Sequence, residues 1–281
     1  MTPVPQTSPN PERAPRFGLI VVGDEILSGK RTDKHLAKVI ELLKARGLQL
    51  DYADFVGDAP ARIVVTLQRA FASGDVVFSC GGIGATPDDH TRQCAAQALG
   101  VGLALHPEAE ALIRQRMQDM AREQGTVYEA NRPDNVHRLN MGVFPVGATI
   151  IPNPFNKIPG FSCGDVYFLP GFPVMAWPMI EWVLDNRYRH LFRTDAWLEQ
   201  SVIVYGAMEA ALTPLMQAVE ATFAGVKVFS LPSVDHPEYG RHIELGVKGE
   251  PSQVALAYPK LMEGLRGLGV SIGPELVHKL E

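Results

Sequence analysis

The amino-acid sequence predicts an α/β fold, in which a mostly parallel sheet carries helices on both faces and is followed by a smaller α+β domain. Two observations lead to this prediction. Residues 17–99 alternate three times between a short apolar run and a segment with apolar residues at helical spacing, which is typical of a parallel sheet. Residues 198–268 instead give the order strand, helix, strand, strand, helix, which is typical of a small α+β domain.

Length and composition are those of an ordinary folded protein. The chain has 281 residues, of which 46% are hydrophobic and 20% are charged, which is enough for two domains. Its three cysteines are widely spaced, which argues against a disulfide framework and a zinc site and fits a reducing compartment. No apolar run approaches the roughly 18 residues of a membrane span, and the first residues lack the apolar core of a signal peptide. We therefore expect a cytoplasmic protein.

The first domain is expected over residues 16–190, after a proline-rich tail. Residues 1–15 carry five prolines and little apolar content, which predicts disorder. The elements that the pattern then predicts are a strand over 17–22, a helix over 33–46, a strand over 48–56, a helix from Pro60, a strand over 76–78 and a helix over 93–99. Asp33 is expected to cap the first of these helices.

The rest of this domain is less regular. A helix is expected over 107–122, and a turn-rich stretch over 125–159 follows it. A polar loop of this length is usually functional or mobile, although its asparagines would equally well serve turns. A strand over 166–169 and a helix over 173–189 are expected to complete the domain.

The second domain is expected over residues 191–281. Its predicted elements are strands over 198–205, 226–231 and 242–247 and helices over 208–223 and 254–268. The tetrapeptide from Gly246 to Gly249 matches the G-x-x-G of RNA-binding KH folds. This domain holds 7 Lys and Arg against 11 Asp and Glu, and the whole chain has a net charge of −5. Because nucleic-acid binding draws on positive charge, we expect a structural or dimerising domain.

The strongest local signal is the glycine-rich segment after the third predicted strand. Gly81, Gly82 and Gly84 allow the backbone to approach a ligand, and a helix that follows them would offer free N–H groups to an anion. Thr86 and Asp89 also fit a helix start, with Thr86 as N-cap and Asp89 reaching back to it. A plain turn and helix cap is therefore the alternative to a phosphate site.

Two pairs of carboxylates favour the phosphate site. Asp88 and Asp89 are adjacent, and they would repel a phosphate unless a cation lay between them, as Mg²⁺ commonly does. Asp24 and Glu25 form a second pair at the tip of the first strand. Because a parallel sheet brings the ends of its strands to one edge, the two pairs are expected to face a common ligand site.

Taken together, the motifs resemble the MoaB/Mog-type molybdopterin-binding domain, in the version at the start of the competence/damage-inducible CinA proteins. The matching segments in chain order are Gly23–Gly29 with Asp33, Gly81–Asp89 with Thr91, Ala130–Arg132, Asn153–Pro154 leading to Gly160, and Leu169–Pro173. The resemblance covers residues 16–190, and residues 191–281 resemble the KH-like appendix of CinA proteins more loosely. It implies a three-layer α/β domain with its site at the carboxyl ends of the strands, and a homodimer.

The resemblance also implies a class of ligand. Related domains bind molybdopterin or its adenylylated form, and CinA-type members are associated with metal-dependent hydrolysis of dinucleotide pyrophosphates such as ADP-ribose or FAD. We therefore expect a pterin or nucleotide pyrophosphate, hydrolysed with a divalent metal (Mg, Mn, Co or Ni). The alternative is a carrier that holds a pterin phosphate without turnover. The sequence departs from the family at His35, where an asparagine is usual, and at Val174, where a glutamate is common.

The expected site residues follow from the motifs and the resemblance. Asp24, Asp88 and Asp89 are the expected catalytic residues, and Asp88 and Asp89 the expected metal ligands. Arg132 and Lys157 would stabilise charge on phosphorus, while Asn131 and Asn153 would contact the ring or ribose. The full set of expected ligand-binding residues is Gly23, Glu25, Ser28, Gly29, Asp33, Gly81, Gly82, Gly84, Thr86, Asn131, Arg132, Asn153, Lys157, Gly160, Pro170 and Gly171.

Overall fold

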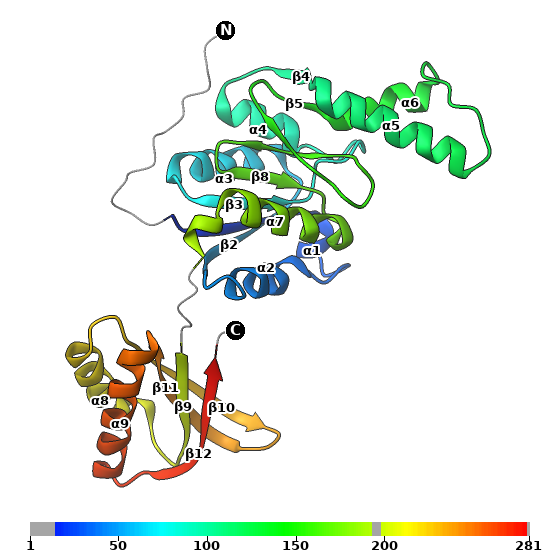
Figure 1. The fold of residues 1–281 in the computed structure, drawn as a ribbon. Coiled ribbons are helices and arrows are strands. Elements are labelled where there is room, and N and C mark those ends of the chain that lie inside the picture. Colours follow the sequence, from blue (N-terminus) through cyan, green and yellow to red (C-terminus); the bar gives the residue numbers. More distant parts are fainter. Residues whose placement is uncertain (1–14, 193–197, 280–281) are drawn as a thin grey trace. The chain divides into compact units, whose positions relative to one another are not determined.

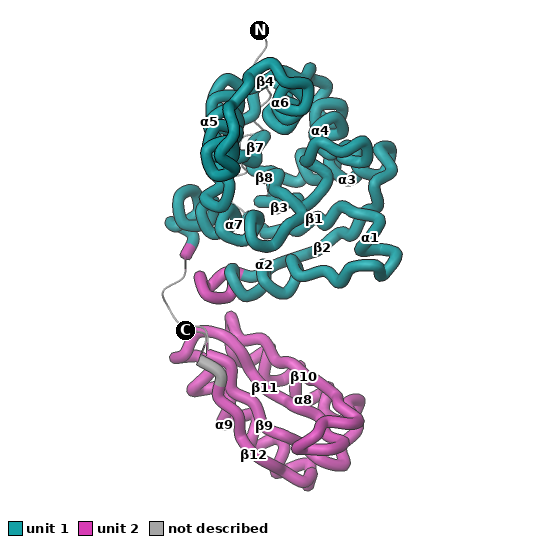
Figure 2. Tube along the Cα trace, turned by 90° about the vertical axis from the view of Figure 1, so that its right-hand side faces the viewer, with its two compact units in different colours: residues 1–43, 49–191 teal, residues 44–48, 192–281 magenta. Residues whose placement is uncertain are grey.

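The computed structural model describes residues 15–192 and 198–279. The expected tail therefore lies, apart from Pro15, outside the described residues. The chain divides into two compact units, residues 1–43 with 49–191 and residues 44–48 with 192–281 (Figure 2). Nothing in the sequence indicated that segment 44–48 groups with the second unit. Among the described helices, none has the length and apolar character needed to cross a membrane.

The first unit is built on a six-stranded sheet with the order β2-β1-β3-β8-β7-β6. The four strands from β2 to β8 are parallel, while β7 and β6 are antiparallel to their neighbours. The predicted mostly parallel α/β fold is thus confirmed. The strands span Leu50–Val56 (β2), Phe17–Val22 (β1), Val76–Cys80 (β3), Val166–Leu169 (β8), Gly160–Cys163 (β7) and Thr149–Ile151 (β6).

Helices cover both faces of this sheet. Figure 1 shows α3 and α4 on one face and α2 and α7 on the other. Every residue of β1, β3, β7 and β8 is buried, which explains why these strands are continuous apolar runs rather than alternating ones. The helices span His35–Lys44 (α2), Pro60–Ser73 (α3), Thr91–Leu99 (α4) and Pro173–Arg187 (α7). The chain therefore forms the expected three layers.

Most helix starts agree with the predicted caps. The carboxylate of Asp33 accepts hydrogen bonds from the backbone N–H groups of His35 and Leu36, both at 2.9 Å, so Asp33 caps α2 as predicted. Proline opens α3, α7 and α5 (Pro107–Glu123) at their first turns. The predicted start of α4 is wrong, because this helix begins at Thr91 and not within residues 86–89.

The stretch over 125–159 contains more structure than the sequence indicated. A short helix α6 (Pro133–Arg138) leads into the 3₁₀ turn η1 (Leu139–Gly142). Strand β5 (Val143–Pro145) then pairs with β4 (Leu103–Leu105), and β6 with β7. The rings of Phe144, Phe161 and Phe168 stack in series, with centroids 4.7 and 4.4 Å apart, and join these short strands to the core.

The second unit is a four-stranded antiparallel sheet with the order β10-β11-β9-β12. Buried residues of its two helices form one core with β9 and β11. The sequence missed the last strand, in which Pro274 lies at a break in the register. The G-x-x-G tetrapeptide lies inside β11 and not in a loop. The elements are β9 (Leu198–Tyr205), α8 (Glu209–Thr222), β10 (Lys227–His236), β11 (Gly240–Gly249), α9 (Pro251–Gly267) and β12 (Ser271–Lys279).

Strand direction in the first unit decides where its loops meet. Because β1, β2, β3 and β8 are parallel, the segments after all four strands lie at the same edge of the sheet. Strand β7 runs opposite to β8, and β6 runs opposite to β7, so the loop over 152–159 that joins β6 to β7 reaches this edge too. Five loops from distant parts of the sequence thus surround one place.

Candidate functional site

A cavity of about 370 Å³ lies among these five loops. Its wall includes residues that follow β1, β2, β3 and β8, residues of the β6–β7 loop, and Met141 of η1. Eleven of the expected site residues line it: Gly23, Glu25, Gly81, Gly82, Gly84, Thr86, Asp88, Asp89, Asn153, Pro170 and Gly171. The structure thus brings the two carboxylate motifs and the glycine-rich segment together around a single cavity.

The glycine-rich segment forms one wall of the cavity. Gly81 and Gly82 have φ angles of 109° and 67°, which favour glycine, and a Cβ atom on Gly82 would meet the hydroxyl of Thr91. The N–H of Gly81 donates to the carbonyl of Leu169 at 3.0 Å and is not free for a ligand. Among the described residues, no protein acceptor is bonded to the N–H groups of the next four residues, 82–85. The backbone N–H groups of these four cavity-lining residues thus make no hydrogen bond to the described protein.

Residues 86–89 close a turn instead of opening the helix. The Asp89 carboxylate accepts hydrogen bonds from the N–H of Thr86 at 2.9 Å and from its hydroxyl at 2.5 Å. The N–H of Asp89 donates in return to the Thr86 carbonyl at 3.1 Å. The contact of Asp89 back to Thr86 that the sequence suggested is therefore present, but Thr86 caps no helix, because α4 begins only at Thr91. Thr86 therefore does not orient the N-terminus of α4.

The pKa values of Asp88 and Asp58 are shifted in opposite directions. The nearby polar group of Thr86 is the main cause that lowers the pKa of the exposed Asp88. Burial raises the pKa of Asp58, and the nearby carboxylates of Asp24, Glu25 and Asp88 act in the same direction. Asp58 lines the cavity, although the sequence did not single it out as a site residue. Its position directly after the second predicted strand is the signal that could have identified it.

Asp24 holds two loops together and does not line the cavity. Its Oδ1 accepts a hydrogen bond from the backbone N–H of Asp58 at 3.1 Å, and its own N–H donates to Oδ2 of Asp58 at 2.9 Å. Asp33 is occupied as the cap of α2. Gly160 lies buried inside β7, where a Cβ atom would meet the carbonyl of Phe168. Ser28 and Gly29 end the short helix α1 (Asp24–Leu27) and also lie outside the cavity wall.

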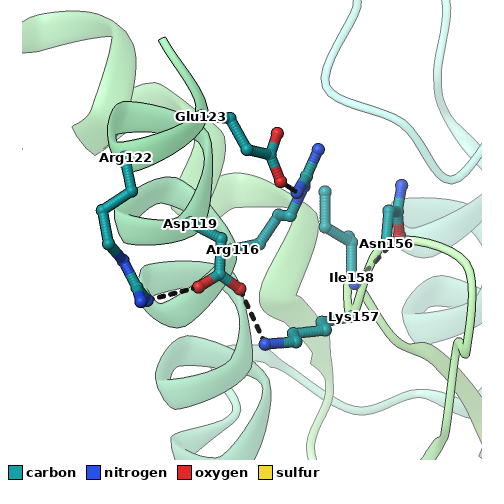
Figure 3. Close-up of polar contacts among 7 residues, drawn as sticks. All are labelled: Arg116, Asp119, Arg122, Glu123, Asn156, Lys157 and Ile158. Atoms are coloured by element: carbon teal, nitrogen blue, oxygen red, sulfur yellow. Dashed lines mark hydrogen bonds and ion pairs between the residues drawn. The ribbon is translucent and has the colours of Figure 1, made fainter. Parts of the chain in front are cut away.

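The two cations that the sequence indicated are paired elsewhere. Arg132 forms two hydrogen bonds with Asp134, at 2.6 and 2.8 Å, and neither it nor Asn131 lines the cavity. The Nζ of Lys157 lies 2.7 Å from a carboxylate oxygen of Asp119 on α5 (Figure 3). Lys157 has a φ angle of 66°, and it too is absent from the cavity wall. Their expected roles at phosphorus are not supported by this geometry.

The side chain of Asn153 shapes the β6–β7 loop. Its amide nitrogen donates to Oδ1 of Asn156 at 2.8 Å and to the carbonyl of Ile158 at 2.9 Å, while its oxygen accepts from the N–H of Phe155 at 3.0 Å. The asparagine therefore serves a turn, as the alternative interpretation held. Beside it, an apolar wall faces the cavity, formed by Met141, Ile158, Pro159, Phe172 and Met175.

Arg92 lies beneath the glycine-rich segment. Its side chain is only 5% exposed, and its guanidinium donates to the carbonyl of Gly84. Burial lowers the pKa of Arg92, and the charge of Asp89 opposes that shift. The sequence motifs assigned Arg92 no role, because a charged residue at a helix start gives no sign of burial.

Comparison with known proteins identifies the family. Residues 18–190 match the family model described as a probable molybdopterin binding domain. The chain belongs to this family. The matched range contains all of the loops that form the cavity, so the cavity is a feature of the molybdopterin-binding domain.

Individual relatives refine this assignment. A CinA-like protein of Geobacter sp. (strain M21) is 30% identical over 206 residues, which are 72% of this chain and 47% of that protein. A protein of Caldivirga maquilingensis is 28% identical over 272 residues, 92% of this chain and 99% of that protein. The crystal structure of CinA from Thermoplasma acidophilum is 27% identical and covers 61% of this chain and 98% of that one, with a TM-score of 0.51. The resemblance to a CinA-like molybdopterin-binding domain is thus confirmed, and the chain spans about half the length of the Geobacter relative.

The cavity wall carries carboxylates, which are the type of donor that hard divalent cations prefer. Among the described residues, no three His, Cys, Asp or Glu side chains are grouped so that they would hold a metal alone. The available donors are carboxylate oxygens of Glu25, Asp58, Asp88 and Asp89, which all line the cavity. Mg²⁺ and similar ions are commonly held by one or two carboxylates, with water and phosphate oxygens completing the shell. A cation held here would need water and ligand oxygens in its shell, because the described residues form no closed protein cage.

Proposed function

We propose that this domain binds a pterin or nucleotide that carries a phosphate or pyrophosphate, and that it hydrolyses the pyrophosphate with the help of a divalent cation. The observation that carries the proposal is that two chemically different sets of residues line one cavity. The first set is residues 82–85, whose N–H groups have no protein acceptor, together with four carboxylates, and the second is apolar side chains that include Phe172 and Met175. A phosphate joined to a flat heterocycle presents matching polar and apolar parts.

The two sets of residues would bind the ligand by hydrogen bonding and by stacking. The N–H groups after Gly81 would donate to phosphate oxygens, since successive backbone N–H groups in a turn form an anion-binding concavity. Phe172 is 56% exposed at the start of α7 and lines the cavity, so its ring is accessible for stacking on a heterocycle. Asp88 and Asp89 would hold the cation, which would supply positive charge to the phosphates and lower the pKa of an attacking water.

The carboxylates suit different tasks in the hydrolysis. A water oxygen would form a bond to one phosphorus while the bond from that phosphorus to the bridging oxygen breaks, and the bridging oxygen would leave with the other phosphate. Asp58 is the carboxylate best suited to accept the proton of that water, because its pKa is raised. Asp88 is suited to remain ionised beside a cation, because its pKa is lowered.

A second candidate function is binding without turnover. It is favoured by the finding that the described residues provide no group of three metal-binding side chains. In that case the same cavity would hold a pterin phosphate, and the protein would act as a carrier linked to molybdenum cofactor assembly. In either case we propose a homodimer, from the resemblance alone, and a cytoplasmic location, from the unpaired cysteines.

The two functions are separated by a turnover experiment. The full chain is incubated with ADP-ribose, FAD, NAD or coenzyme A, with Mg²⁺, Mn²⁺, Co²⁺ or no metal, and release of the nucleoside monophosphate is measured. We expect metal-dependent release that Asp88→Asn lowers by at least about 100-fold. Asp134→Asn serves as the control, because Asp134 is an exposed carboxylate bonded to Arg132 outside the cavity. Absence of turnover, together with thermal stabilisation by a molybdopterin-type ligand, would establish the carrier instead.

A further inference from the structure

We infer that Arg31 binds the anionic end of the ligand and selects for phosphate esters over the uncharged base or nucleoside; this rests on the proposed function. Arg31 lies between α1 and α2, is exposed and lines the cavity. Among the described residues that line the cavity, it is the only Lys, Arg or His. The sequence motifs did not indicate it, because it lies between the two matched positions Gly29 and Asp33.

The guanidinium of Arg31 is available for a ligand. Among the described residues, none forms an ion pair with it or accepts a hydrogen bond from it. Its backbone is nevertheless fixed, since its N–H donates to the carbonyl of Glu25 at 2.9 Å. Three other cations of this domain are already occupied: Arg132 by Asp134, Lys157 by Asp119, and Arg92 by the carbonyl of Gly84. Arg31 is therefore anchored at its backbone and unpaired at its charged end.

The charge of the cavity makes this cation important for an anion. Four carboxylates line the cavity, namely Glu25, Asp58, Asp88 and Asp89, and Arg31 is the one positive side chain that the described wall sets against them. A phosphate that enters meets net negative charge, so its affinity depends strongly on each positive group it reaches. A guanidinium offers two parallel N–H groups to two phosphate oxygens, which an ammonium group does not. An uncharged ligand would gain little from the same side chain.

Binding measurements on the full chain test this role. The dissociation constants of α,β-methylene-ADP, AMP and adenosine are measured by calorimetry in the presence of Mn²⁺, for the wild-type protein and for three variants. Arg31→Met should weaken both phosphate ligands by about 10- to 100-fold and leave adenosine unchanged. Arg31→Lys should retain part of the affinity, because it keeps the charge but not the paired donors. Arg132→Met should change nothing, since Arg132 lies outside the cavity.

Two results would overturn the inference and leave the proposed function intact. If wild-type protein binds the phosphate ligands and Arg31→Met binds them equally well, Arg31 does not contact the anion. If Arg31→Met loses adenosine and the phosphate ligands to the same extent, Arg31 maintains the cavity and does not select the anion. If the wild-type protein binds neither phosphate ligand, the proposed binding of nucleotides fails and the inference fails with it. Equal melting temperatures of the variants show that the fold is retained.

Discussion

At the scale of single residues, Asp58 connects the structure of the site to its electrostatics. Its carboxylate and backbone form reciprocal hydrogen bonds with Asp24, which joins the loop after β1 to the loop after β2. This arrangement keeps an acidic side chain partly buried near three other carboxylates, and the pKa of Asp58 is raised mainly by the burial. The folded protein therefore carries a destabilising negative charge at the cavity when no ligand is bound.

Replacement of Asp58 by asparagine should therefore stabilise the ligand-free protein at neutral pH. A carboxyl group whose pKa is higher in the folded state than in the unfolded state opposes folding when it is ionised, and this penalty disappears as the pH falls through the raised pKa toward the ordinary value. The amide oxygen that the substitution introduces can still accept the N–H of Asp24. We expect Asp58→Asn to raise the melting temperature at pH 7 by about 1–3 °C. Thermal unfolding at a series of pH values measures this.

The matched control for this prediction is Asp54→Asn. Asp54 also lies at β2 but forms a surface ion pair with Arg69 at 3.0 Å, so its replacement should give no gain. A lower melting temperature for Asp58→Asn at pH 7 would show that the hydrogen bond to Asp24 requires the charged carboxylate.

Which predicted site residues reach the cavity depends on partners that the sequence reveals only in part. Asp134 lies two residues from Arg132, so their pairing was readable from local sequence. Asp119 lies 38 residues from Lys157 and faces it only because α5 packs beside the β6–β7 loop (Figure 3). The glycine-rich segment with Asp88 and Asp89 lines the cavity, since a parallel sheet dictates where its strand ends meet, whereas Asp24 does not line it. Arg31 and Met141 showed no pattern that distinguishes them from ordinary surface and core residues.

At the scale of elements, the loop from Gly81 to Asp89 requires glycine at position 82 for two reasons, its backbone conformation and the lack of space for a side chain. Gly82 has a positive φ angle and is also in close contact with Thr91 at the start of α4. Gly29, which follows α1, has a nearly equal φ angle of 72°, but a Cβ atom there would meet nothing within 4 Å. The two positions therefore differ in available space and hardly at all in backbone conformation.

This pair separates backbone strain from steric conflict. Gly29→Ala should lower the free energy of unfolding by about 1 kcal/mol, which is the cost of a left-handed conformation for alanine. Gly82→Ala should lower the free energy of unfolding by about 1–3 kcal/mol more than Gly29→Ala does, because Thr91 and the cavity wall have to shift. Chemical denaturation of both variants measures the difference. Equal losses would show that α4 moves freely away from the loop, contrary to the contact seen in the structure.

Helices and strands were predictable where a capping residue marks their start or where apolar residues recur at regular spacing over a long segment. Asp33, Pro60, Pro107 and Pro173 each mark a helix start that the structure contains. The short strands β5, β6 and β7 lie in or beside a turn-rich stretch and show no periodic pattern, and the stacked rings of Phe144 and Phe161 join β5 and β7 to the core. Thr86 was misassigned as a helix cap because the same hydrogen bonds also close an isolated turn.

At the scale of the whole molecule, each compact unit has a separate hydrophobic core. The core of the first unit includes Leu67, Val77 and Phe168, and that of the second includes Val202, Leu245 and Leu261. Cores of this kind unfold as separate cooperative steps when neither depends on the other. The cavity lies wholly in the first unit, so a bound ligand should raise the free energy of unfolding of that unit only.

Calorimetry of the full chain should therefore show two thermal transitions. Addition of α,β-methylene-ADP with Mn²⁺ at about 100 times its dissociation constant should raise one transition by about 5–10 °C and leave the other in place. The Arg31→Met variant at the same ligand concentration should show a smaller rise. A single transition that moves as a whole would mean that the two units unfold as one.

The antiparallel end of the large sheet determines which part of the cavity wall can change independently. The β6–β7 loop contributes part of the cavity wall, yet it belongs to a hairpin at the margin of the sheet and is followed by no covering helix of its own. Changes in its length or side chains need not disturb the helices that pack on β1 and β3. The tip of this hairpin is therefore a part of the cavity wall that can be rebuilt without moving the glycine-rich segment or the helices beside it.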